Sequence, residues 1–261
     1  MPTMQTICKI EFRKLLHRKD LWLILSMLAI PALYSIGIYT HSSVITFNGT
    51  DKEYAMSFFV NMFHFVYALY IYFFVLSLIS VRSLGGEIEN RNILLYTQRI
   101  NERKKLYQAK VTALTAMVLG VSAVFFVFSM LMFYLFAVHR TDLISSRFMV
   151  SNEFLSLILW FLSIVLAYIL TIHFSLMLST FLKFNTAVII FILVLIASAF
   201  MSKFPIVSFL SIHYYIEQFG ALDLSDSGGA LRLFGINLAV VFLYSLVCKQ
   251  VGVRRFERRD L

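Results

Sequence analysis

The chain has 261 residues, of which 60% are hydrophobic and 14% are charged, and it carries a formal net charge of +9. Soluble domains average roughly 45–50% apolar and about 25% charged residues, so this composition excludes an ordinary soluble domain and indicates an integral membrane protein. The excess of Lys and Arg requires no nucleic-acid partner, because basic residues beside apolar segments are the usual pattern of membrane proteins.

Residues 1–20 predict an amphipathic helix at the membrane surface. Apolar side chains such as Phe12 and Leu15 fall on one arc, and basic side chains such as Arg13 cover most of the other. Such a helix lies in the headgroup layer with its cations toward anionic lipid. The plainer alternative is a charge cluster that only orients the first span. We do not expect a cleaved signal peptide, because the apolar run from Leu21 has full span length and no small-residue cleavage site follows it.

Six apolar segments are long enough to cross a bilayer as helices, which takes about 20 residues each. Because they are apolar all round rather than alternating, a β-barrel is not expected. The predicted fold is an all-α membrane protein of one transmembrane domain with six helices after the interfacial one. The spans are placed at residues 21–40, 58–81, 111–138, 154–178, 186–202 and 230–248.

The distribution of Lys and Arg predicts the orientation. With the N-terminus inside, the inner segments hold 18 of these residues and the outer segments hold 5. Cytoplasmic loops keep positive charge, so both termini are expected in the cytoplasm of a cell whose plasma membrane holds the protein. Cys8 and Cys248 then lie on the reducing side, where no disulfide is expected. No motif in the sequence has metal-ligand spacing.

The charged segment 82–110 joins the second and third spans on the inner side. Gly85 and Gly86 permit a break after the second span, and Glu87 and Glu89 favour the start of a new helix. A turn at 98–101 and a second helix running into the third span are expected to follow. This pattern predicts a docking element for a cytoplasmic partner, and a solvated basic loop is the alternative.

Three stretches of the sequence resemble the membrane subunits of type-2 ABC transporters. GEIENRNILLYTQRINERKKLYQAK (86–110) is similar to that family's segment between spans two and three, although residues 90–92 stand where the family has Gly-Thr and residues 100–101 where it has Pro. FLSIHYYIEQFGALDLSDSGGALRLFGINLAVVFLYSLVCKQ (209–250) resembles the segment that leads into the last span. RRFERRDL (254–261) resembles the basic tail of the family.

The resemblance implies a permease with two membrane subunits, identical or different, and two cytoplasmic ABC ATPase subunits. It implies that the charged segment 82–110 is a coupling segment, which contacts the ATPase through Glu87, Glu89 and Arg91. Phe12 and Arg13 of the interfacial helix are implied to contact it as well. The sequence has no GxxxxGK[ST] phosphate loop, so ATP and Mg²⁺ are expected in the partner and no cofactor in this chain. We therefore do not expect the chain itself to be an enzyme, and it offers no paired carboxylates or metal ligands for a membrane-embedded one.

Residues 203–229 form the longest predicted outer loop. The loop is too polar and too interrupted to span the membrane, but its aromatic residues suit short helices that dip into the outer leaflet. The resemblance implies that this region closes the outer end of the translocation path, and ordinary interfacial packing is the alternative. The candidate gate residues are Phe209, Tyr214, Tyr215 and Phe219.

Ionisable side chains inside the spans are the candidates for the translocation path. They are His64 and His173, either of which could instead be satisfied by neighbouring backbone or water, and Arg232, which can instead extend outward to the membrane surface. The abundance of Phe and Tyr suggests a hydrophobic or amphipathic cargo, such as a peptide or antibiotic that the cell exports or resists. The alternative function is a non-transporting membrane anchor or sensor that recruits a cytoplasmic partner through residues 85–110.

Overall fold

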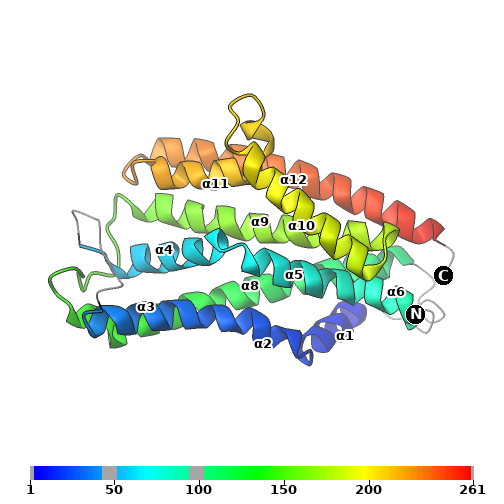
Figure 1. Cartoon of the computed structure of the whole chain (residues 1–261), viewed down its shortest axis with the longest axis horizontal. Coiled ribbons are helices and arrows are strands. Elements are labelled where there is room, and N and C mark those ends of the chain that lie inside the picture. Colours follow the sequence, from blue (N-terminus) through cyan, green and yellow to red (C-terminus); the bar gives the residue numbers. More distant parts are fainter. Residues whose placement is uncertain (1–2, 43–51, 94–102, 260–261) are drawn as a thin grey trace.

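The computed structural model describes residues 3–42, 52–93 and 103–259, and it is a bundle of long helices (Figure 1). Within these ranges no strand forms, and the one β-pairing is an isolated bridge between Glu53 and Ile144. The helices and short helical turns are α1 (Met4–Leu16), α2 (Asp20–Leu25), η1 (Ser26–Leu28), α3 (Ala29–Tyr39), α4 (Ala55–Ala68), α5 (Ile71–Val81), η2 (Arg82–Gly86), α6 (Glu87–Glu89), α8 (Arg103–Leu135), η3 (Ala137–His139), α9 (Phe154–Phe181), α10 (Phe184–Met201), η4 (Ser208–Leu210), α11 (Ile212–Ala221) and α12 (Ser227–Arg258).

Six helical segments of the described chain are long and apolar enough to cross a membrane. They overlap the six segments expected from the sequence, so the multi-pass, all-helical class is confirmed. The helices extend beyond the apolar runs: α8 begins at Arg103, and α12 continues to Arg258. At about 1.5 Å per residue, these two helices reach well past a hydrocarbon layer of about 30 Å.

The second expected span is broken in its middle. Tyr70 adopts φ 55°, in the left-handed region, and separates α4 from α5. A non-glycine residue in this region costs about 1–2 kcal/mol, so surrounding contacts must hold it. The expected span 58–81 is therefore divided between α4 and α5, and the helical segment long and apolar enough to cross a membrane by itself is Ile71–Glu89.

The prediction of a helix break at Gly85 and Gly86 is wrong, because η2 and α6 continue α5 as one helical segment to Glu89. The turn comes instead after Glu89, where Arg91 has φ 55°. Gly85 has a packing role, since a Cβ placed on it would lie 3.3 Å from the Cβ of Ser179 in α9. The turn expected at 98–101 lies outside the described residues.

The core of the bundle is aromatic. Rings of α4, α8 and α9 pack edge to face or tilted, with centroids 4.9 Å apart for Phe63 and Phe161 and 5.3 Å apart for Phe63 and Phe125. α9 lies at the centre and contacts α4, α5, α8, α10, α11 and α12. By contrast, only 17% of the residues in the apolar stretches of α10 and α12 are buried, against 61% in α9. These last two long helices are therefore peripheral.

Both chain ends lie at one end of the bundle, together with α6 (Figure 1). Exposed basic side chains such as Arg13, Arg91 and Arg258 belong to segments at this end. We call it the basic end, and the opposite one the far end. α10 starts at the basic end and runs obliquely to about half-way along the bundle (Figure 1). α11 runs beside the first half of α12 (Figure 1).

Candidate functional site

The most unusual polar feature is a buried ion cluster of two lysines and two glutamates near the basic end. Lys110 of α8 has a side chain that is 1% exposed. Its ammonium group donates to Glu11 Oε2 at 2.8 Å, to Glu87 Oε2 at 2.7 Å and to the carbonyl oxygen of Ser83 at 2.7 Å. These three acceptors match the three N–H donors of a lysine, so the buried charge is fully hydrogen-bonded.

Lys14 of α1 also belongs to the cluster. It lies 2.5 Å from Glu11 Oε1 and 3.1 Å from Glu87 Oε1, so each glutamate bridges both lysines. The four formal charges cancel, as a buried group of ions requires. Burial alone would raise the pKa of Glu11, but the charges and hydrogen bonds of Lys110 and Lys14 outweigh burial and hold this pKa below its ordinary value.

The cluster joins three segments that are distant in the sequence. Glu11 and Lys14 belong to α1, Glu87 to α6 and Lys110 to α8. The docking of α1 follows its sequence, because Ile7, Glu11 and Leu15 recur every fourth residue and form one buried stripe against α8. A displacement of α6 therefore acts directly on α1 and α8.

The other expected coupling residues occupy different positions. The Glu89 carboxylate accepts a hydrogen bond of 2.6 Å from the backbone N–H of Phe184 and so provides a partner for one of the N–H groups that the start of α10 leaves unpaired. Phe12 is partly buried against the core. Arg13 and Arg91 are exposed at the surface of the basic end, where a second protein could reach them.

The C-terminal segment is tied to the same end. Arg103, at the start of α8, donates to the carbonyl oxygen of Arg259 at 2.6 Å. Arg259 in turn donates to the carbonyl oxygens of Ser179 and Thr180 at the end of α9. The last carbonyls of a helix lack partners within the helix, so these arginines fasten α8, α9 and α12 together.

Sequence reasoning missed Glu11 and Lys110 as partners of Glu87. A signal was present for each: Glu11 is the one acid among the basic residues of α1, and Lys110 stands at the edge of an apolar run. A charged residue at either place is expensive to bury unless it has a partner. Which residues pair depends on how α1 packs on α8, and local periodicity does not specify this.

The structure places the four candidate gate residues on or beside α11. Phe219 and Tyr215 are 1% and 5% exposed, whereas Phe209 is 54% exposed. Tyr215 donates to the carbonyl oxygen of Phe209 at 2.7 Å, and its ring packs edge to face on Tyr214. α11 thus presents a buried face to α9 and α12.

The two candidate path histidines lie apart. His64 of α4 packs on the rings of Trp160 and Tyr67, with centroids 4.8 Å and 5.7 Å away. His173 of α9 is hydrogen-bonded through Nδ1 to the carbonyl oxygen of Ile169, 2.9 Å away. A third histidine, His213, missed by sequence reasoning, is 1% exposed and bonds through Nδ1 to the hydroxyl of Tyr67 beside the break in span two.

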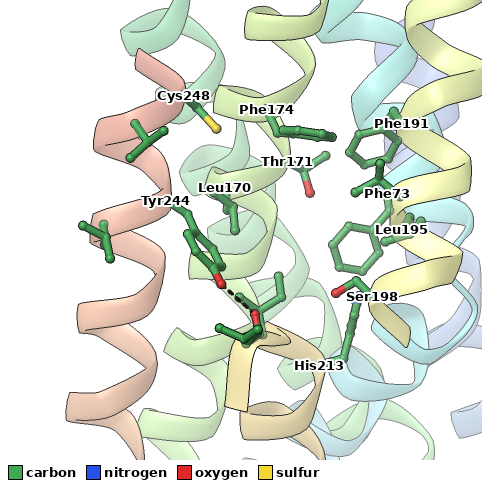
Figure 2. Close-up of a pocket in the computed structure, with 15 residues that line it drawn as sticks. Phe73, Leu170, Thr171, Phe174, Phe191, Leu195, Ser198, His213, Tyr244 and Cys248 are labelled. Atoms are coloured by element: carbon green, nitrogen blue, oxygen red, sulfur yellow. Dashed lines mark hydrogen bonds between the residues drawn. The ribbon is translucent and has the colours of Figure 1, made fainter. Parts of the chain in front are cut away.

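A cavity of about 460 Å³ lies between the middle parts of α9 and α12 and the helix α10 (Figure 2). Its walls are mainly aliphatic and aromatic side chains such as Leu170, Phe174 and Phe191. Small-molecule sites are usually clefts of this size, mostly apolar with a few placed polar groups. Among the described residues, no three His, Cys, Asp or Glu side chains gather in a way that could hold a metal ion.

Comparison with known proteins adds no assignment: no family model matches the chain, and no significant match was found among curated proteins.

Proposed function

We propose that the chain is the membrane-spanning permease subunit of an ATP-driven transporter of the type-2 ABC class. In this proposal, a second membrane subunit and two cytoplasmic ATPase subunits complete the assembly. The protein lies in the plasma membrane with its basic end on the cytoplasmic side. The sequence resemblance suggests the class. The observation that carries the proposal is the buried ion cluster that joins α1, α6 and α8.

The cluster suits a subunit that is moved by a partner. α6 is three residues long, ends in an exposed turn and is fixed to two longer helices through Glu87. Force on that turn would therefore reach α8 by way of Lys110 and α10 by way of the Glu89 carboxylate. A rigid connection from an exposed turn to two long helices is what coupling ATP hydrolysis to the bundle requires.

The roles of the expected coupling residues then divide. The exposed cations Arg13 and Arg91 contact the ATPase, and Phe12 anchors α1 to the core. Glu87 and Glu89 act inside the subunit and transmit the movement. The substrate is a hydrophobic or amphipathic compound, such as a peptide or antibiotic, because the cavity between α9, α10 and α12 is apolar. Export is the proposed direction.

Co-purification from the native cell tests the proposal. The tagged chain is isolated in mild detergent, bound proteins are identified by mass spectrometry, and ATP hydrolysis of the complex is measured in nanodiscs. We expect an ABC ATPase in the wild-type sample. The double variant Arg13→Glu/Arg91→Glu should reduce the bound ATPase by about tenfold, whereas Glu87→Gln should retain it but lose stimulation of hydrolysis by the transported compound.

The matched control is Arg147→Glu/Arg232→Glu, which makes the same charge change at exposed residues away from the basic end. It should bind the ATPase like the wild type. If no ATPase binds under any mild condition, the proposal is overturned. Capture of a different cytoplasmic protein, released by the same Arg13→Glu/Arg91→Glu variant, would support a membrane anchor or sensor instead.

A further inference from the structure

The cavity between α9, α10 and α12 opens sideways toward the bilayer. α10 and α12 each pack against α9 and α11, and in Figure 2 they stand on opposite sides of the cavity. The lining residues at this opening, Val194 of α10 and Leu243 and Val247 of α12, are 43%, 58% and 52% exposed. A molecule dissolved in the membrane can therefore enter between the two helices without crossing water.

One end of the cavity is polar. η4 and the start of α11 close it, and there Ser198 and His213 join the lining (Figure 2). None of the lining residues is Asp, Glu, Lys or Arg. Because an ionised group without a charged partner is costly to bury, this end selects an uncharged head group.

The hydrogen bonds of Ser198 and His213 leave one donor and one acceptor between these two residues. The hydroxyl of Tyr67 has no other acceptor among the described residues, so it donates to His213 Nδ1 and leaves the ring proton on Nε2. Ser211 donates to the carbonyl oxygen of Ser198 at 2.8 Å, so the Ser198 hydroxyl donates to Ser211 Oγ at 3.1 Å. The lone pairs of Ser198 Oγ then remain available to accept a hydrogen bond.

A hydroxyl group uses both through a single atom, because its oxygen accepts one hydrogen bond and donates another. We infer that this cavity binds an uncharged, single-chain amphiphile with a hydroxyl head, of the long-chain alcohol or monoacylglycerol class. The head lies at Ser198 and His213, and the alkyl chain follows the apolar wall toward Cys248. The inference deepens the proposed function by naming the substrate class, and its transport consequence rests on that function.

Photo-crosslinking to the purified chain tests the inference without any ATPase. The probe is a hexadecanol that carries a diazirine in mid-chain and a terminal alkyne, and adducts are located by mass spectrometry. We expect adducts on α10 and α12 residues that line the cavity, removed by excess unlabelled hexadecanol. The carboxylate analogue, a diazirine-bearing palmitate at neutral pH, should label these residues about tenfold less.

Two variants and a matched control distinguish the cavity from the lipid-facing surface. Leu195→Trp fills the cavity and should reduce labelling about tenfold. Leu193 lies on the same helix, does not line the cavity and is 61% exposed, so Leu193→Trp should leave the labelling unchanged. Ser198→Ala should keep chain binding but remove most of the preference for the alcohol over the matching alkane probe.

Equal labelling of the Leu195→Trp and Leu193→Trp variants, or no preference for the hydroxyl head, would overturn the inference. Binding that follows these variants while no ATPase co-purifies overturns the proposed function alone. An ATPase-coupled chain that binds no alcohol probe in the cavity overturns this inference alone.

Discussion

Lys110 shows how this chain places a cation at the edge of its apolar core. Moving a lone ammonium group out of water costs several kcal/mol even after the protein relaxes. Here two carboxylates and one backbone carbonyl within 2.8 Å compensate that cost. Removal of one member leaves the others buried with unbalanced charge, so the cluster is more sensitive to single changes than to its removal as a whole.

We predict that Lys110→Met lowers the free energy of unfolding by about 3–5 kcal/mol, because it leaves Glu11 and Glu87 with one partner fewer. The thermal midpoint in detergent, followed by tryptophan fluorescence, measures the change. Lys104→Met removes a lysine from an exposed position of the same helix and should change the midpoint little. Equal midpoints for the two variants would mean that the cluster contributes nothing to stability.

Individual residues were the part of the site that sequence predicted least well. Glu87 was recognised as important because charge stood out between two apolar runs, but its partners could not be read from spacing. They come from α1 and α8, separated from Glu87 by 73 and 23 positions. His213 was missed because it stands in a polar-looking loop, where nothing local predicts its burial against Tyr67, Tyr70 and Phe73.

At the level of elements, α1 is held by ion pairs as well as by its apolar stripe. The pKa of Glu11 is lowered in the fold by Lys110 and Lys14, which outweigh its burial. A carboxylate with a lowered pKa stabilises the fold above its unfolded pKa, and this contribution is lost as the pH falls through the folded value. The pH range in which this stabilisation is lost lies below 4.5, the ordinary pKa of a glutamate side chain.

We therefore predict that acidification below about pH 4.5 loosens α1 before the rest of the bundle. Hydrogen exchange read by mass spectrometry should show faster exchange in α1 with little change in α9. In Glu11→Gln this pH dependence should be absent, because the titrating group is gone. Loss of protection in α1 and α9 together would indicate global unfolding rather than local release of the helix.

Gly252 sets the approach of α12 to α8. A Cβ placed on Gly252 would lie 2.9 Å from Cζ of the buried Tyr107 ring and closer still to its hydroxyl oxygen. We predict that Gly252→Ala destabilises the protein by about 1–3 kcal/mol, as overpacking usually does. Gly235→Ala, on the same helix with open space around it, is the control. A thermal midpoint that is the same in both variants would contradict this close contact.

The sequence predicts the helices well where the apolar runs are long. It does not predict helix breaks that depend on tertiary contacts. The run from 58 to 81 contains no Pro or Gly, so nothing local indicates the break at Tyr70. The contacts of Tyr67 and Tyr70 with His213 lie beside that break. Conversely, Gly85 and Gly86 look like a helix break in the sequence, yet the helix continues because Gly85 lets it approach α9 closely.

For the whole molecule, the placement of both termini at one end agrees with the even number of helical segments in the described chain that are long and apolar enough to cross a membrane (Figure 1). We predict that this basic end faces the cytoplasm. With Cys8 and Cys248 replaced by Ser, a membrane-impermeant maleimide on intact cells should label Arg147→Cys at the far end but not Lys104→Cys at the basic end, two exposed positions. Permeabilised cells should show labelling of both. The reverse pattern on intact cells would invert the proposed topology.

The low burial of α10 and α12 has a consequence for biosynthesis. The chain emerges from the ribosome in order, and α1 to α9 already contain the aromatic core and the ion cluster. α10 and α12 bury only 17% of their apolar stretches, so they join a bundle that is largely assembled. Arg259 then fastens the end of α9 once α12 has been synthesised. A ribosome-stalled chain that ends after α9 should thus already be protease-resistant in the membrane.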